Sequence, residues 1–228
     1  MVDEILKDSF LGMLQIMQAD MIKLSDVAET SAREEAMKIV NSGRGYHTTS
    51  SIGHNLSYAG TVHSKLTAPL AMTCFAIMDV IGKILDNCII KLDDNDSASS
   101  GSFINHAREF EKFINRDYLK NPKTAEKFQD AFRHSMAHCF LPGSTKRVAY
   151  EITYHYEFAN EPLIFDRGTE YVLNVKCLSA MTQNVLEKLI TMTKLAQKED
   201  QVVVDKIVES FELVIKQASQ KLEHLEDN

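Results

Sequence analysis

Apolar residues recur at steps of three and four along most of the chain, which is the spacing of one face of an α-helix. Residues 6–24 carry such a stripe, and residues 64–90 are the most apolar segment, which predicts a central core helix there. The capping-box spacing from Ser31 to Glu34 predicts either a new helix at residues 31–40 or an unbroken continuation of the first. Further helical patterns cover residues 102–116, 123–140, 177–197 and 200–225.

The helical pattern stops after Pro142-Gly143, where apolar and polar residues begin to alternate. Alternation from residue 148 to residue 158 is strand periodicity, and short apolar segments follow at 163–165 and 171–175. Turn residues separate these segments, so we predict a small antiparallel β-hairpin or a three-stranded flap, supported by helices.

The predicted fold class is therefore mainly α. We expect a helical bundle of about five core helices at residues 64–225, with the β-hairpin inserted at 148–175. Two regions are predicted along the chain: an N-terminal helical segment and loop at residues 1–63, and the helical bundle at residues 64–228.

Composition narrows the function classes. The chain has 228 residues and a formal net charge of -7, so a surface that binds nucleic acid through broad positive potential is not expected. A local basic site is compatible with this charge. The four cysteines are scattered and form no C-x2-C pair, which argues against a zinc ribbon or a disulfide framework and predicts reduced thiols.

The same composition predicts a cytoplasmic protein. The residues after Met1 lack the positive start and apolar run of a secretion signal. The most apolar segment contains Pro69, Asp79 and Lys83, so its uninterrupted part is too short to span a bilayer. We therefore expect no membrane partner.

Candidate chemistry is concentrated in the helix that Asn121-Pro122 starts. This helix carries Arg133, His134 and His138, and each of these side chains must reach water or a polar partner. Something polar is therefore expected beside this helix. The alternative is that Arg133 pairs with Asp130 or Glu126 on its own helix and that His138 caps the last turn.

Histidines four residues apart, such as His134 and His138, occur as paired zinc ligands in the H-E-x-x-H motif. Here Ser135 takes the place of the glutamate and no third ligand is identifiable, so no metal and no cofactor are expected. An arginine beside a histidine suits a phosphodiester instead. Histidine exchanges a proton near neutral pH, and arginine stabilises the charge that develops on phosphorus-bound oxygens.

The run from Arg133 to His138 reads R-H-S-M-A-H, and this R-polar-x3-H pattern resembles the signature of the HEPN superfamily (higher eukaryotes and prokaryotes nucleotide-binding). The flanks are similar to a bacterial HEPN-like group. They comprise an aromatic-rich helix at residues 103–113, a proline just after the motif, a strand excursion, and Leu173-Asn174-Val175 at the entry to a further helix. The resemblance covers roughly residues 64–225 in order of elements.

This resemblance implies an α-helical bundle that dimerises so that two motifs face one cleft. Many HEPN proteins are metal-independent endoribonucleases of toxin–antitoxin, CRISPR and abortive-infection systems, whereas others only bind nucleotides or partners. By position, the resemblance makes Arg133 and His138 the catalytic pair and His134 the polar residue that orients them. The implied partners are RNA, a second copy of the chain, and an antitoxin or other protein.

Two other functions are kept open by the sequence. One is a catalytically inactive HEPN-like protein that binds a nucleotide or a partner. The other is a structural helical oligomer, since the first and last helices have long apolar stripes. For the nuclease, a homodimer is also favoured by geometry, because Arg133 and His138 are separated by roughly 140° on an ideal α-helix.

Overall fold

The computed structural model describes residues 3–41, 66–90, 103–134, 149–153, 162–166, 170–196 and 198–226. These residues are mainly helical, which confirms the predicted fold class. The helices are α1 (Glu4–Asn41), α3 (Thr67–Ile90), α4 (Phe103–Lys112), α5 (Pro122–Lys127), η1 (Phe128–His134), α7 (Val175–Leu195) and α8 (Lys198–Glu226). The strands are β1 (Ala149–Thr153), β2 (Ile164–Asp166) and β3 (Glu170–Asn174).

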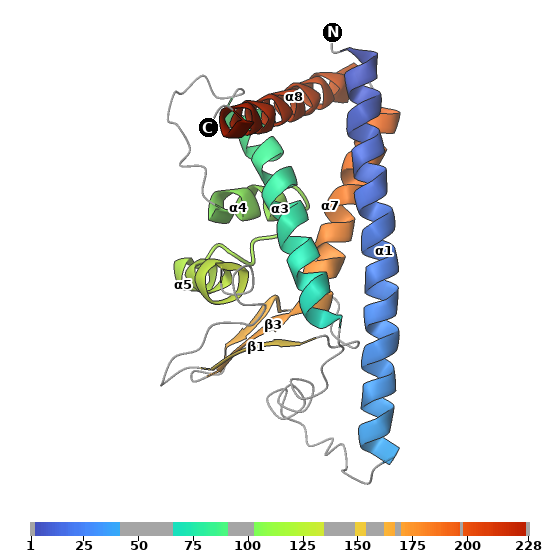
Figure 1. Cartoon of the computed structure of the whole chain (residues 1–228), viewed down its shortest axis with the longest axis vertical. Coiled ribbons are helices and arrows are strands. Elements are labelled where there is room, and N and C mark those ends of the chain that lie inside the picture. The colour runs from blue at the N-terminus through green and yellow to red at the C-terminus, as the bar shows by residue number, and fades with distance from the viewer. Residues whose placement is uncertain are drawn as a thin grey trace.

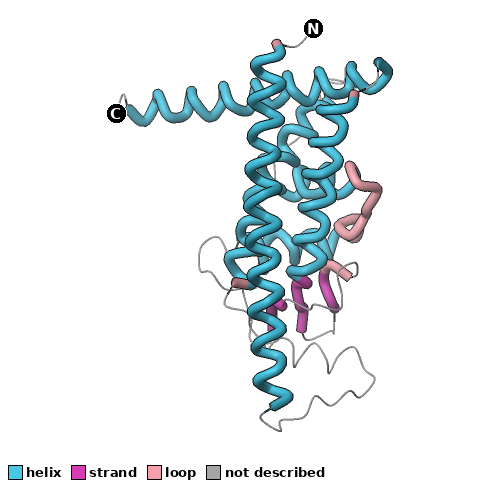
Figure 2. The backbone as a smooth tube through the Cα atoms, turned by 90° about the vertical axis from the view of Figure 1, so that its right-hand side faces the viewer, coloured by secondary structure: helices cyan, strands magenta, loops and turns pink. Residues whose placement is uncertain are grey.

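Helix α3 is the centre of the bundle, as its apolar sequence predicts. It contacts α1, α4, α7 and α8, and its apolar side chains are buried on several faces. Figure 1 shows α1, α7 and α3 running alongside one another, with α4 and α5 on the other side of α3. Helix α8 lies crosswise at the end of the bundle near the start of α1, and the strands lie towards the opposite end (Figures 1 and 2).

Helix α1 continues without a break through Ser31, so the alternative of a second helix beginning there is wrong. One stripe of α1 enters the common core, and Ala28 and Ala32 continue that stripe into the capping-box sequence. The two regions predicted on either side of residue 63 therefore share one core in the described residues. The boundary itself falls at residues that the structure does not describe.

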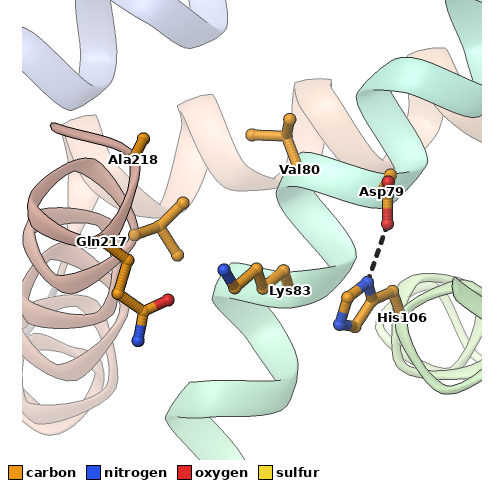
Figure 3. A pocket seen from close by; sticks show the side chains of 7 residues that line it. Asp79, Val80, Lys83, His106, Gln217 and Ala218 are labelled. Carbon is orange, nitrogen blue, oxygen red and sulfur yellow. Dashed lines mark hydrogen bonds and ion pairs between the residues drawn. The ribbon is translucent and has the colours of Figure 1, made fainter. Parts of the chain in front are cut away.

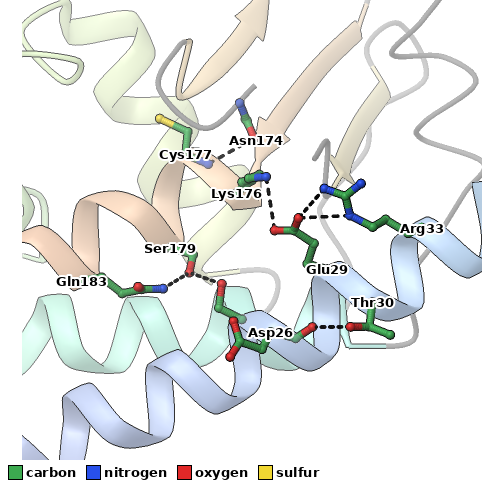
Figure 4. Close-up of polar contacts among 10 residues, drawn as sticks. Asp26, Glu29, Thr30, Arg33, Asn174, Lys176, Cys177, Ser179 and Gln183 are labelled. Carbon is green, nitrogen blue, oxygen red and sulfur yellow. Dashed lines mark hydrogen bonds and ion pairs between the residues drawn. The ribbon is translucent and has the colours of Figure 1, made fainter. Parts of the chain in front are cut away.

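Polar contacts fasten α1 to the start of α7 (Figure 4). The Glu29 carboxylate accepts hydrogen bonds from Arg33 on its own helix, at 2.7 and 3.1 Å, and from Lys176 at 3.2 Å. The Arg33 hydrogen bonds, helped by Lys176 and opposed by burial, hold the pKa of Glu29 below its ordinary value. Close by, Ser179 Oγ lies 3.3 Å from Ser25 Oγ. The long first helix is thus fixed to the bundle at about two thirds of its length.

The three described strands form a mixed sheet in the order β1-β3-β2. Strands β2 and β3 are antiparallel, which confirms the predicted hairpin, with Phe165 opposite Val172. Strand β1 pairs with β3 in parallel register, with Ile152 opposite Leu173, and this parallel edge was not predicted. Strand β3 is the central strand, hydrogen-bonded on both sides, and its residues Val172 and Leu173 are buried. The strand that leads into α7 is therefore held by a neighbour on each side.

Asn174 joins the sheet to α7. Its side-chain oxygen accepts the Cys177 N–H at 3.2 Å as the helix N-cap, and its amide donates to the Pro162 carbonyl at 3.2 Å. Its backbone N–H donates to the Leu163 carbonyl at 2.9 Å. Because Asn174 is fully buried, these bonds satisfy groups that water cannot reach, and they set where the strand ends and the helix begins.

The window Thr67–Cys88 of α3 is long and apolar enough to cross a membrane by length and composition, with a mean hydropathy of 1.6. Core helices of soluble proteins have the same properties, and 56% of this window is buried inside the bundle. The finding agrees with the prediction of a buried core helix. Of the four cysteines, Cys74, Cys88 and Cys177 lie in the described residues, where they are buried and form no disulfide.

Candidate functional site

The helix that carries the motif changes its winding before it reaches Arg133. It begins as predicted at Pro122, where the Asn121 side chain accepts the Lys123 N–H at 2.9 Å, and it passes from α5 into the π-helical segment η1 at Phe128. π-helices are rare and are found frequently at functional sites. Arg133 and His134 end this segment, whereas His138 lies within residues 135–148, outside the described part of the chain.

Arg133 turns away from its own helix and towards α3. Its Nη2 atom lies 3.3 Å from Asp79 Oδ2, and its guanidinium carbon lies 4.9 Å from the centre of the Phe103 ring. The expected polar neighbour of this helix is therefore Asp79, and the alternative pairing with Asp130 or Glu126 is not the one formed. About one third of the Arg133 side chain is exposed, so the charge remains accessible from solvent.

Three aromatic rings form a cluster next to Arg133, and the guanidinium lies over one of them, Phe103. Phe128 at the start of η1 packs edge-on against Phe75 of α3, with 5.3 Å between the ring centres. It also stacks on Phe103 of α4, with 6.0 Å between the ring centres. Phe75 and Phe103 also meet edge-on at 6.1 Å. The cluster anchors η1 to both helices, and its Phe103 ring is the surface on which the Arg133 guanidinium lies.

Asp79 also binds a buried histidine. His106 Nδ1 of α4 lies 2.8 Å from Asp79 Oδ1, and the His106 side chain is 6% exposed. The hydrogen bond from His106, with the charges of His106 and Arg133, lowers the pKa of Asp79 in spite of its partial burial. A carboxylate accepts hydrogen bonds, so Nδ1 carries the proton and Nε2 is the ring nitrogen left to meet a ligand.

Gly82 allows α4 to come close enough for this contact. A Cβ atom at position 82 would lie 2.3 Å from the backbone oxygen of His106, a distance that no side chain tolerates. The two helices thus touch through their backbones within one turn of Asp79. Only glycine fits at this crossing, and the crossing fixes the position of the His106 ring beside the carboxylate.

Two cavities meet at Asp79. One, of about 280 Å³, is lined by Arg133 together with Asp79, Met72, Phe75 and Ala76. The other, of about 440 Å³, lies between α3, α4 and α8 and is lined by Asp79, Val80, Lys83, His106, Val214, Gln217 and Ala218. A single carboxylate therefore lies between a cavity with an arginine and a cavity with a lysine and a histidine.

The structure thus brings the predicted Arg133 together with two groups that sequence reasoning missed, Asp79 and His106. His134 is exposed at the end of η1. A signal for the missed pair exists in the sequence: a carboxylate inside the most apolar helix requires a partner, and His106 stands three residues after Phe103 on the apolar face of the next helix.

Within the described residues, no group of three or more His, Cys, Asp or Glu side chains could hold a metal ion. The described residues around Asp79 instead provide a guanidinium, a histidine held in one tautomer by a carboxylate, and a neighbouring lysine. Comparisons of the chain with models of protein families, with curated proteins and with solved structures found no match.

Proposed function

We propose that this protein is a HEPN-like, metal-independent endoribonuclease of the cytoplasm, acting as a toxin or defence effector. The observation that carries the proposal is the position of Arg133. The arginine of the motif lies at a cavity, is held there by Asp79 and Phe103, and has a histidine bound to the same carboxylate. Such a group is suited to stabilise the negative charge that develops on a phosphodiester.

The proposed reaction transfers the phosphodiester bond within the RNA. A base removes the proton of the 2′-hydroxyl, the 2′-oxygen attacks the adjacent phosphorus, and the bond to the 5′-oxygen breaks as an acid protonates it. The products are a 2′,3′-cyclic phosphate and a 5′-hydroxyl. In this proposal Arg133 stabilises the phosphorane, His138 is the proton carrier, and His134 orients them.

A homodimer belongs to the proposal, but its geometric support changes. The separation of roughly 140° between Arg133 and His138 applies to an α-helix. The described part of the motif lies in π-helical winding, where hydrogen bonds span five residues and each residue turns less. The exposed face of α1, with Ile5, Ile16 and Val27 at 75%, 66% and 54% exposure, favours association of two chains. This face lies on the opposite side of α3 from the motif helix (Figure 1), so contact through it alone does not bring two motifs to one cleft.

One observation favours an inactive nucleotide-binding protein as the second candidate. Arg133 already has a carboxylate partner in Asp79, so part of its charge is balanced before any phosphate arrives.

The third candidate, a structural oligomer, is favoured by the same exposed α1 face. Light scattering distinguishes a dimer from a larger assembly or a monomer.

The test is incubation of the purified protein with mixed RNA in the presence of EDTA. We expect cleavage to fragments with 2′,3′-cyclic phosphate ends, and loss of cleavage in Arg133→Ala and in His138→Ala. Arg33→Ala is the matched control, because Arg33 is an exposed arginine paired with Glu29 on α1. Cleavage that persists in Arg133→Ala, or that EDTA abolishes, would refute the proposal. If the RNA stays intact but binds to the protein, and if Arg133→Ala abolishes this binding, the protein is the inactive binding protein instead.

A further inference from the structure

We infer that the cavity between α3, α4 and α8 is a nucleotide subsite, in which Lys83, His106 and Gln217 bind a phosphate group. The inference rests on the proposed function, because it assigns to the same nuclease a second place at which its substrate is held. Its volume of about 440 Å³ lies within the range of small-molecule sites in proteins.

The polar groups of this cavity are of the kind that binds an anion. Figure 3 shows Lys83 extending from α3 across the cavity towards Gln217 of α8. Within the part of the chain that the structure describes, Lys83 forms no ion pair or hydrogen bond. A lysine ammonium that lines a cavity without a carboxylate partner is a point charge suited to phosphate, and the Gln217 amide adds donors on the facing helix.

His106 supplies a third group. Its Nδ1–H is directed to Asp79 at 2.8 Å, and its other ring nitrogen lies on the cavity side in Figure 3. Because the ring is buried and its tautomer is fixed, Nε2 has one direction in which to meet a ligand. An imidazole oriented in this way presents Nε2 to the ligand as its hydrogen-bonding atom.

Among the described residues that line the cavity, the one acidic group does not oppose an anion. Asp79 Oδ1 accepts from His106, and Asp79 Oδ2 pairs with Arg133 on the side of the other cavity. Both carboxylate oxygens are therefore turned to cationic or donor groups. The other described lining residues are apolar, with Val80 from α3 and Val214 and Ala218 from α8, and they offer a surface for the face of a base or a ribose.

A phosphate bound to Lys83 and an apolar wall beside it together indicate a nucleotide as the ligand. The nucleotide has two sources, a free mononucleotide or a residue of the RNA chain next to the bond at Arg133. We therefore measure, by calorimetry on the full chain, the binding of AMP and of a short oligoribonucleotide whose 2′-hydroxyls are methylated. The methylated chain lacks the attacking hydroxyl and stays intact.

We expect Lys83→Met to weaken the binding of at least one of these ligands by roughly tenfold, the loss of one charge-assisted contact. Gln217→Ala should weaken the same ligand less. Lys120→Met is the matched control, because Lys120 is an exposed lysine outside the cavity, and it should leave both affinities unchanged. Dependence on Lys83 for AMP identifies a free nucleotide, and dependence for the methylated chain alone identifies RNA.

The inference is overturned if neither ligand binds at millimolar concentration, or if both bind Lys83→Met as tightly as the unaltered protein. Thermal melting of each variant excludes loss of folding as the cause of weaker binding. Failure here is distinguishable from failure of the nuclease proposal. Arg133-dependent cleavage with Lys83-independent binding removes only the subsite, whereas Lys83-dependent binding with intact RNA in every variant removes only the nuclease.

Discussion

Glu111, at the end of α4, makes stability depend on pH in the direction opposite to that of most carboxylates. Its side chain is buried, and both carboxylate oxygens accept the Leu119 N–H at 3.1 Å. Burial, with a contribution from the charge of Asp117, raises the pKa of Glu111 from 4.5 to about 7, although the Leu119 hydrogen bond acts the other way. Between pH 4.5 and about pH 7, the Glu111 carboxyl therefore keeps its proton in the folded protein but has lost it in the unfolded chain.

The sign follows from the proton difference. Between the unfolded pKa of 4.5 and the folded value of about 7, the folded state binds more protons, so the free energy of unfolding falls as pH rises. Above about pH 7 the free energy of unfolding has lost the whole contribution of Glu111 and no longer changes with the ionisation of this group. One pKa unit corresponds to about 1.4 kcal/mol, so the raised pKa amounts to a destabilisation on the order of 3 kcal/mol at alkaline pH.

Glu111→Gln removes the ionisation and keeps an oxygen that accepts the Leu119 N–H. We expect the variant to be more stable than the unaltered protein by on the order of 3 kcal/mol at about pH 8, and the difference to shrink towards zero as pH falls below about 5. Urea denaturation followed by circular dichroism at a series of pH values measures this difference. Glu187→Gln, at an exposed glutamate of α7, is the control for removal of one negative charge. A Glu111→Gln difference that is independent of pH would refute the reasoning.

Three further variants test the packing and capping of the helices. Gly82→Ala should destabilise the protein by about 1–3 kcal/mol and reduce RNA cleavage, because its Cβ meets the backbone of His106, whereas Gly12→Ala, with no atom within 4 Å, should stabilise it by up to about 1 kcal/mol in the same thermal melt. Asn174→Ala should lower the free energy of unfolding by about 2 kcal/mol, since it removes the cap from the Cys177 N–H inside the core; equal stability in urea would contradict the role of the cap.

Local sequence patterns predicted the elements that depend on local periodicity. The apolar run of α3, the hairpin of β2 and β3, and the start of the motif helix at Asn121-Pro122 all follow from spacing and turn chemistry. The continuous α1 was left open, because Ser31 and Glu34 fit a capping box as well as a helix interior. Burial of Ala28 and Ala32 against the core decides between the two.

Features that depend on distant contacts were not predicted. Arg133 pairs with Asp79, 54 residues earlier, and His106 binds the same carboxylate from a third element. The parallel pairing of β1 depends in the same way on where β3 lies. The π-helical winding of η1 leaves no periodic signature in its seven residues, so sequence spacing alone did not predict it.

The backbone contact at Gly82 also bears on the entropy of ligand binding. A catalytic or binding histidine is commonly held by side-chain packing, which leaves rotamers to be fixed when the ligand arrives. Here the main chains of α3 and α4 meet at the residue itself, and the ring is already bound to Asp79. Little conformational freedom remains to be lost at His106, so a phosphate that reaches the cavity finds this group already ordered, and more of the interaction energy appears as affinity.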